Sequence, residues 1–125
     1  MFELIIIVDF EAAHCIRDYP GKCSRLHGHN WKVEIMVVGN KLNSLGMLID
    51  FRDLKEEVNK VIGTLDHYYL NEIEAFRIIN PTAENIAKHI YEELVSQPVF
   101  AGDIQVRSIK VWESPHSAVT YRQEA

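Results

Sequence analysis

The stretch Phe-Glu-Leu-Ile-Ile-Ile-Val-Asp-Phe-Glu-Ala-Ala-His occupies residues 2–14 and predicts a long β-strand, because it is rich in branched and aromatic side chains and contains no Gly or Pro. Successive side chains of a strand point to opposite faces, so the even-numbered residues form one mostly apolar face, which His14 continues. Ile5 and Ile7 make the other face apolar as well. We therefore expect the first half of this strand to be covered on both faces.

A second strand is predicted for residues 28–39, and its apolar positions have the same parity as His27 and His29. Two imidazoles placed two residues apart on a strand lean toward one point, which is an arrangement that can chelate a metal ion. A catalytic zinc site typically takes three protein ligands and keeps the fourth position for water or substrate, and His14 is the candidate third ligand. A His-x-His pair is also an ordinary feature of surfaces and cores, so the spacing alone leaves both interpretations open.

The segment Cys-Ser-Arg-Leu-His-Gly-His, residues 23–29, adds a thiol to the two imidazoles. Basic side chains lie close to it in the sequence, namely Arg17, Lys22, Arg25 and Lys32. Such a cluster could meet an anionic ligand, although basic residues near a loop are about as often simply solvated.

The rest of the chain alternates between helical and extended patterns. We predict amphipathic helices from residue 51 to about 63, capped by Asp50, and over residues 83–96, capped by Thr82. Residues 72–81 are predicted to form a loop. Two more strands are expected over residues 104–113 and 118–122, joined by a hairpin loop at 114–117.

Two further places carry polar groups with more than one interpretation. Asp66 stands next to His67 in the linker after the first helix, where a carboxylate can hold an imidazole in one tautomer, or can simply cap a turn beside an exposed histidine. Glu113 ends an apolar row of the third strand, so it either points to solvent or binds something. His89 and His116 lack such neighbours, and we expect the first to be structural and the second to be exposed.

Composition limits the class of protein. The 125 residues predict a single domain over residues 1–125, with enough apolar side chains for a core. A formal net charge of −5 argues against non-specific binding of nucleic acid. Two cysteines make no disulfide framework, and the apolar run at residues 4–8 is too short to span a membrane, so we expect a soluble cytoplasmic protein.

Taken in order, these motifs resemble the 6-pyruvoyltetrahydropterin synthase family, and within it the 6-carboxytetrahydropterin synthases of queuosine biosynthesis. The matching segments cover essentially the whole chain: Phe10-Glu11-Ala12-Ala13-His14, Cys23 through His29, Gly46-Met47 with Ile49-Asp50-Phe51, Leu65-Asp66-His67 with Leu70-Asn71, Asn80-Pro81-Thr82 with Glu84-Asn85, and Val111-Trp112-Glu113. No single one of these segments would suffice, but six in the same order are a specific signal.

The resemblance implies a role for each matching residue. The zinc ligands would be His14, His27 and His29. Cys23 would be the proton-abstracting thiolate, which the neighbouring basic residues favour. The resemblance also implies a relay of Asp66 and His67, a pterin anchor at Glu113, and further pocket residues at Thr82 and Glu84. Cys15 is outside the motif, and strand parity turns it away from the metal, so we expect a small core residue there.

The resemblance also implies the fold, the assembly and the reaction. The fold would be the tunnelling fold, or T-fold: an α+β domain with a four-stranded antiparallel sheet and two helices on one face, which assembles into barrels as a homohexamer of two trimers. The implied enzyme is a zinc-dependent lyase that converts 7,8-dihydroneopterin triphosphate into 6-carboxytetrahydropterin, acetaldehyde and triphosphate. Two alternatives stay open: a 6-pyruvoyltetrahydropterin synthase, which keeps the side chain, and a non-catalytic zinc-binding oligomer.

Overall fold

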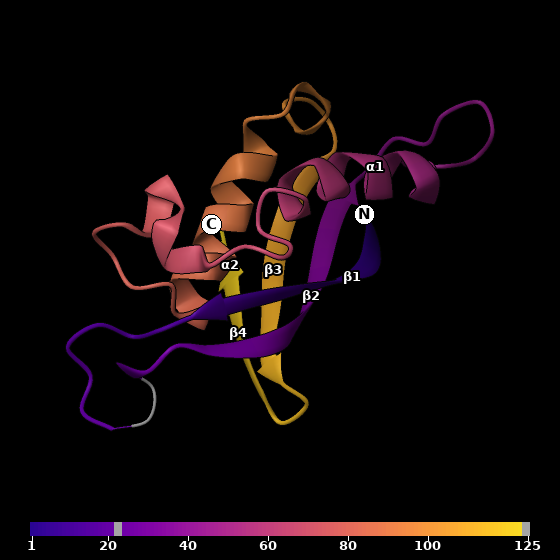
Figure 1. The fold of residues 1–125 in the computed structure, drawn as a ribbon. Helices are drawn as coiled ribbons and strands as arrows, with labels where there is room; N and C mark the ends of the chain where they lie inside the picture. The colour runs from indigo at the N-terminus through magenta and orange to yellow at the C-terminus, as the bar shows by residue number, and fades with distance from the viewer. Residues whose placement is uncertain (22–23, 124–125) are drawn as a thin grey trace.

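The computed structural model describes residues 1–21 and 24–123, and it contains one four-stranded antiparallel sheet in the order β1-β2-β3-β4 (Figure 1). The strands are β1 (Phe2–His14), β2 (His27–Gly39), β3 (Gln105–Ser114) and β4 (Ser117–Arg122). Each strand pairs with the next one along the chain, and β1 and β4 are the edges of the sheet. The predicted α+β class and sheet are confirmed.

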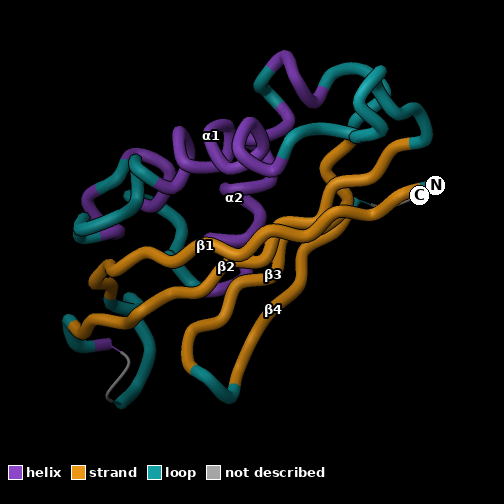
Figure 2. The backbone as a smooth tube through the Cα atoms, turned by 90° about the vertical axis from the view of Figure 1, so that its right-hand side faces the viewer, coloured by secondary structure: helices purple, strands orange, loops and turns teal. Residues whose placement is uncertain are grey.

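Both helices lie on one side of the sheet, which Figure 2 shows edge-on. Helix α1 (Phe51–Ile62) begins where the Asp50 carboxylate accepts a hydrogen bond from the Arg52 backbone N–H, at 2.8 Å. Helix α2 (Ala83–Val95) begins where the Thr82 hydroxyl oxygen accepts from the Asn85 N–H, at 3.2 Å. Both predicted N-caps are therefore confirmed, and they fix where the chain turns into each helix.

The core fills the space between the helices and the facing side of the sheet. Trp31 and Phe10 are its largest side chains, and their rings stack with centroids 6.0 Å apart. The even-numbered residues of β1 and the odd-numbered residues of β2 supply the sheet side of this core, as strand parity predicts. His14 is buried at the end of the same apolar row.

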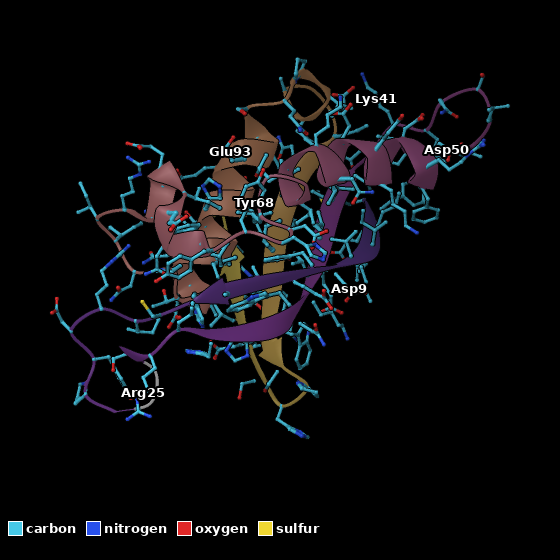
Figure 3. The ribbon with its side chains drawn as sticks, in the orientation of Figure 1. Asp9, Arg25, Lys41, Asp50, Tyr68 and Glu93 are labelled. Atoms are coloured by element: carbon cyan, nitrogen blue, oxygen red, sulfur yellow. The ribbon has the colours of Figure 1, made fainter. Side chains whose placement is uncertain are left out.

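The opposite face of the sheet is not covered within the chain. Ile5 and Ile7 project from it and are 52% and 47% exposed, so the second covering layer predicted for β1 is not supplied by this chain's own helices. The remaining side chains of that face are mostly polar or charged, including Asp9 on β1 (Figure 3). Exposed Ile side chains on the edge strand β1 leave apolar surface that another chain could cover.

The predicted loop over residues 72–81 is wrong in part, because short 3₁₀ helices occupy η2 (Leu70–Glu72) and η3 (Glu74–Phe76). Single turns of this kind carry no apolar periodicity that a sequence could reveal. A third one, η4 (Pro98–Phe100), lies before β3. The β3–β4 hairpin is also tighter than predicted, because Ser114 pairs with Ser117.

Among the described helices, none combines the length and the apolar character that crossing a membrane requires.

Candidate active site

Three imidazoles meet at the end of the β1–β2 pair. The register places His14 directly opposite His27 and Ala12 opposite His29, so all three histidines project from the helix-covered face. Their ring centroids lie 4.5 to 5.1 Å apart, and one potential ligand atom from each ring lies within 4.8 Å of the others and of a Glu113 carboxylate oxygen. The structure thus brings together the three predicted metal ligands.

The outer nitrogens of two rings are fixed by backbone carbonyls. The Nδ1 of His14 lies 2.8 Å from the Pro81 carbonyl oxygen, and the Nδ1 of His27 lies 2.7 Å from that of Arg25. A carbonyl only accepts, so both Nδ1 atoms carry the proton and each Nε2 keeps a free lone pair. Metal-binding histidines are oriented by second contacts of this kind.

The inward nitrogens lack satisfied hydrogen bonds. The Nε2 atoms of His14 and His29 are buried without a hydrogen-bond partner in the structure. Burial is the largest influence on both rings and lowers the pKa of His14 and of His29, so both are neutral at pH 7. Neutral imidazoles with unshared lone pairs aimed at one point suit a zinc ion, which prefers nitrogen and sulfur ligands.

Glu113, near the end of β3, joins this group. One carboxylate oxygen lies 3.4 Å from Nε2 of His14 and 3.5 Å from Nε2 of His29, and its negative charge partly opposes the lowering of both pKa values. Its side chain is nevertheless 39% exposed. Glu113 therefore does not simply point to solvent: it can reach either a metal held by the histidines or a ligand beside them.

Two pockets meet at Glu113. One, of about 340 Å³, is lined by Thr82 and Glu84 from the start of α2 and by Tyr19 and Ala118. The other, of about 500 Å³, lies on the opposite side and includes His29, Lys32 and Trp112. Thr82 and Glu84 thus line a pocket with Glu113, as the resemblance implied. The Thr82 oxygen accepts the N-cap bond, so its hydroxyl proton remains available to a ligand.

The predicted relay lies elsewhere. The Asp66 carboxylate is 2.9 Å from Nδ1 of His67 and accepts a hydrogen bond from the Glu11 N–H, at the outer edge of β1. Residue 11 has the opposite parity to residue 14, so the Glu11 side chain, 3.3 Å from Nε2 of His67, lies on the sheet face away from the metal group. His67 is 73% exposed. The structure confirms the Asp–His contact but does not bring it to the histidines of its own chain.

His67 has a left-handed backbone, with φ of 65°. That conformation costs a residue other than Gly on the order of 1 kcal/mol. It is held in place because the His67 N–H donates to the Glu11 carbonyl at 2.6 Å and the Ala13 N–H donates to the Tyr68 carbonyl at 3.2 Å. A strained residue that is clamped on both sides holds its side chain in a defined direction.

The predictions for the two cysteines compare differently with the structure. Cys23, the predicted thiolate, lies outside the described residues. Cys15 is half-buried, and its Sγ lies 3.2 Å from the Tyr69 hydroxyl. The expectation that Cys15 is a core residue is wrong, because the chain leaves the sheet at His14 and residue 15 packs against the η2 segment instead of the core.

Sequence reasoning missed the groups that hold His14 in place. The Asn71 side chain accepts from the Cys15 N–H at 3.0 Å and donates to the Cys15 carbonyl at 2.9 Å. Asn80 makes the same pair of bonds with Arg17, at 2.9 and 3.2 Å. Each amide thus satisfies the backbone N–H and C=O of one residue, as a neighbouring strand would. Together they hold the chain just after β1 against residues 71–81. Nothing in the local pattern signals them, although both residues stand in the segments that carry the resemblance.

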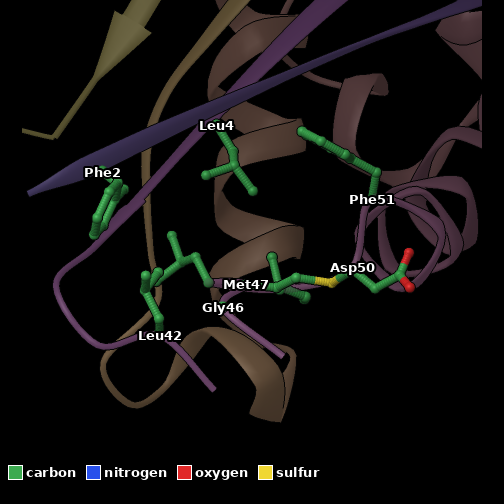
Figure 4. A pocket seen from close by; sticks show the side chains of 9 residues that line it. Phe2, Leu4, Leu42, Gly46, Met47, Asp50 and Phe51 are labelled. Carbon is green, nitrogen blue, oxygen red and sulfur yellow. The ribbon is translucent and has the colours of Figure 1, made fainter. Parts of the chain in front are cut away.

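A third pocket lies at the other end of β1, about 40 Å along the strand from His14. It measures about 280 Å³ and is lined by apolar side chains, among them Phe2, Leu4, Met47 and Phe51 (Figure 4). Its acidic residue, Asp50, already caps α1. The pocket lacks the convergent polar groups of a catalytic site, so the histidine end is the candidate active site.

Known proteins share this chain's sequence and fold. The family model described as 6-pyruvoyl tetrahydropterin synthase matches residues 3–124. The 6-carboxy-5,6,7,8-tetrahydropterin synthase of Synechocystis is 37% identical over 117 residues, covering 90% of this chain and 86% of the relative. The protein of that name from Haemophilus influenzae is 32% identical over 145 residues, covering 98% and 100%. The structure of Caenorhabditis elegans 6-pyruvoyl tetrahydropterin synthase superimposes with a TM-score of 0.86 at 27% identity, covering 98% and 96%.

We predict that Asn71→Ala lowers the free energy of unfolding by about 2 kcal/mol, because the N–H and C=O of Cys15 lose their partners where water reaches them poorly. Urea unfolding at fixed protein concentration measures the change. Asn59→Ala, at an exposed position of α1, is the control and should change stability by less than about 1 kcal/mol. Equal effects of the two substitutions would contradict the fastening role of Asn71.

Proposed function

This chain belongs to the 6-pyruvoyl tetrahydropterin synthase family, and we propose that it converts 7,8-dihydroneopterin triphosphate into 6-carboxy-5,6,7,8-tetrahydropterin, acetaldehyde and triphosphate. That reaction belongs to the biosynthesis of queuosine and related 7-deazapurines. The observation that carries the proposal is the group of three imidazoles beside the Glu113 carboxylate, in which the Nε2 atoms of His14 and His29 are buried without a hydrogen-bond partner. Relatives that carry the name of this synthase match nearly the whole chain.

The cofactor that we propose is one zinc ion per chain, held by His14, His27 and His29. Such an ion would polarise a side-chain hydroxyl of the pterin and acidify it. The protein's own contribution is to keep His14 and His29 neutral and to orient the rings of His14 and His27. Burial keeps His14 and His29 neutral, and the carbonyls of Pro81 and Arg25 hold two of the rings.

The pterin ring would be bound by Glu113 from the pocket that Thr82 and Glu84 line. A carboxylate accepts two hydrogen bonds from the amino-pyrimidine edge of a pterin, which fixes the ring in its plane. Because Glu113 lies beside the imidazoles, a ring anchored there presents its side chain toward them. We assign Thr82 a hydrogen bond from its free hydroxyl proton, and Glu84 a place in the pocket wall.

Proton transfer is assigned to Cys23 and to the pair Asp66 and His67. Cys23 as thiolate would remove the proton from the side-chain carbon next to the ring, and the electron pair would pass into the ring system. The triphosphate then leaves with its bonding electrons. Addition of a water molecule to the side-chain carbonyl carbon next to the ring lets the bond to the following carbon break, which leaves a carboxylate on the ring and releases the other two carbons as acetaldehyde. Asp66 fixes the tautomer of His67 through their 2.9 Å contact, which suits His67 to exchange a proton with the thiol.

Two alternative functions can be separated from this one. A 6-pyruvoyltetrahydropterin synthase would eliminate triphosphate but keep the three-carbon side chain. We favour the carboxy-forming reaction because the cysteine precedes the first histidine of His-Gly-His by four positions, with three residues between them, whereas the pyruvoyl relatives place it further upstream. A non-catalytic zinc protein gains some support from Glu113, since a fourth protein ligand would close the metal site.

We also propose that the chain works as a homohexamer of two trimers, with the active site shared between neighbouring chains. The exposed Ile5 and Ile7 and the edge strands β1 and β4 leave a face and two edges that another copy would cover. His67 contacts the Glu11 side chain, which lies on the sheet face away from the histidines of the same chain, and this supports the idea that each relay serves a neighbour's zinc.

We predict about one zinc per chain in the purified protein, and loss of most of it in His27→Ala and in His29→Ala, because a site with two ligands binds zinc weakly. Elemental analysis measures the ratio. Glu113→Gln keeps the shape of the side chain and should keep the zinc if Glu113 binds the pterin. Loss of zinc from Glu113→Gln would favour the closed, non-catalytic site, and undiminished zinc in both histidine variants would end the metal assignment.

Incubation with 7,8-dihydroneopterin triphosphate should yield acetaldehyde and a carboxylated tetrahydropterin in equal amounts, detectable by mass spectrometry and by an acetaldehyde assay. Cys23→Ala should retain zinc and lose at least about a hundredfold in turnover, because a general base contributes roughly that much. Cys15→Ala is the matched thiol control and should stay within about threefold of the parent activity. A product with an intact three-carbon side chain would assign the chain to the pyruvoyl reaction.

The shared site predicts complementation. Inactive Cys23→Ala and inactive His67→Ala proteins, unfolded together and reassembled, should regain part of the activity, because some interfaces then pair an intact thiol with an intact relay. Native mass spectrometry would show whether mixed oligomers form, and each variant reassembled alone is the control. Mixed oligomers that stay inactive would place thiol and relay in the same chain.

A further inference from the structure

An aromatic side chain lines the pocket that Thr82, Glu84 and Glu113 share. It is Tyr19, which follows β1 and is the only aromatic residue among the described residues around this pocket of about 340 Å³. Tyr19 is 52% exposed, so much of its ring is uncovered within the chain. A large aromatic side chain that is half open to a pocket suits contact with a flat ligand.

The backbone that carries Tyr19 is fastened close to the pocket. The Asn80 amide bonds both the N–H and the carbonyl of Arg17, and the Arg17 guanidinium donates to the carbonyl oxygen of Phe76, at 2.6 Å. Asp18 then has a left-handed backbone, with φ of 63°, which turns the chain sharply before Tyr19. The direction of Tyr19 is therefore set by the contacts of the residues that precede it.

The walls of this pocket are of two kinds. Ala118 and Val119 of β4 are apolar, whereas Glu84 and Glu113 bring carboxylates. A flat heterocycle suits this combination, because its faces can contact the apolar groups and the Tyr19 ring while its N–H groups donate to a carboxylate. The chemistry of the walls therefore favours a ring with apolar faces and a hydrogen-bonding edge.

Basic side chains are absent from the described residues that line this pocket. Of the basic residues that the sequence places near the histidines, Arg17 is engaged with backbone carbonyl oxygens, and Lys32 lies on the other face of the sheet. Lys22 lies outside the described residues. Two carboxylates without a neighbouring cation repel an anion, so the pocket fits the uncharged ring of a pterin triphosphate and not its phosphates.

We propose that the Tyr19 ring stacks on the face of the pterin ring whose edge Glu113 binds, and that Tyr19 thereby selects flat heteroaromatic substrates. This rests on the pterin substrate proposed above. Stacked aromatic rings attract each other beyond the area that they bury, and rings that contain a pyrimidine stack on tyrosine as nucleobases do. Glu113 holds the ring by its edge, whereas Tyr19 covers one of its faces. The second contact adds affinity for the ring without touching the reacting side chain.

Binding of 7,8-dihydroneopterin, which has the ring but no triphosphate, tests the stack by isothermal titration calorimetry with the purified protein. Tyr19→Leu keeps an apolar side chain and should weaken binding about fivefold to tenfold, because it lacks the aromatic face. Tyr19→Phe keeps that face and should stay within about twofold of the parent. Phe51→Leu is the control: it removes an aromatic side chain of similar exposure, 55%, from the apolar pocket at the other end of β1, and it should bind as the parent does.

Kinetics with 7,8-dihydroneopterin triphosphate give the second measurement. Tyr19→Leu should raise KM about fivefold to tenfold while kcat changes by less than about threefold, because the stack acts in binding the ring. Its zinc content should equal that of the parent, since Tyr19 is not part of the histidine group. Parent-like binding and KM in Tyr19→Leu, or an equal loss in Phe51→Leu, would overturn the inference. An equal loss in Tyr19→Phe would also overturn it, because the hydroxyl would then be the contact.

These outcomes separate the stack from the proposed reaction. Binding of 7,8-dihydroneopterin that depends on Tyr19, in a protein that forms no pterin product, would support the stack while refuting the reaction. Product formation with a KM that Tyr19→Leu leaves unchanged would do the reverse. A parent protein that neither binds 7,8-dihydroneopterin nor converts its triphosphate would refute both.

Discussion

The antiparallel register between β1 and β2 is the constraint on which the candidate site depends. It sets His14 opposite His27 and two pairs away from His29, so three imidazoles share a face. A slip of one residue would turn the ligands of one strand to the opposite face of the sheet. Apolar residues continue the same rows toward the core, and Phe10 and Trp31, which pair in this register, are both buried. The packing that stabilises the fold therefore also aligns the ligands, and the register irregularity between Met36 and Val37 lies far from them.

The candidate site buries polar nitrogen atoms that have no hydrogen-bond partner, which lowers the stability of the fold. A buried nitrogen without a partner costs about 1–3 kcal/mol, and His14 and His29 each present one. Burial disfavours the charged form, so protonation cannot relieve this cost at neutral pH. The end of β1 must therefore be held firmly, and the bonds of Asn71, Asn80 and Pro81 supply that hold. A group that accepts both lone pairs would remove the cost, which is a physical reason for the site to bind a metal.

Strand parity and capping rules predicted the individual strands, both helix starts and the apolar rows that His14, His27 and His29 continue, whereas the four-stranded sheet was implied by the family resemblance. The predicted strands, helix starts and rows depend on residues close together in the sequence. The contacts between Asn71 and Cys15 or between His14 and Pro81 join residues 56 and 67 positions apart, and no local pattern reports them. The same limit hid the pocket position of Tyr19, because Tyr19 and Glu113 come to line one pocket only in the folded chain. Glu113 was recognised as a carboxylate that needs a partner, but its closeness to two imidazoles needed the fold.

The sheet separates the two halves of the proposed chemistry. The histidines lie on the face that the helices cover, whereas the Asp66–His67 pair is clamped to the outer edge of β1 and contacts a side chain of the other face. A strained and exposed residue is difficult to explain as a contribution to the stability of a single chain, because His67 gains little burial in return for its left-handed backbone. The same edge and face expose Ile5 and Ile7, whose burial requires another chain. In the proposed assembly one event would account for all of these features: covering Ile5, Ile7 and the edge of β1 would bring each clamped histidine to a neighbouring chain.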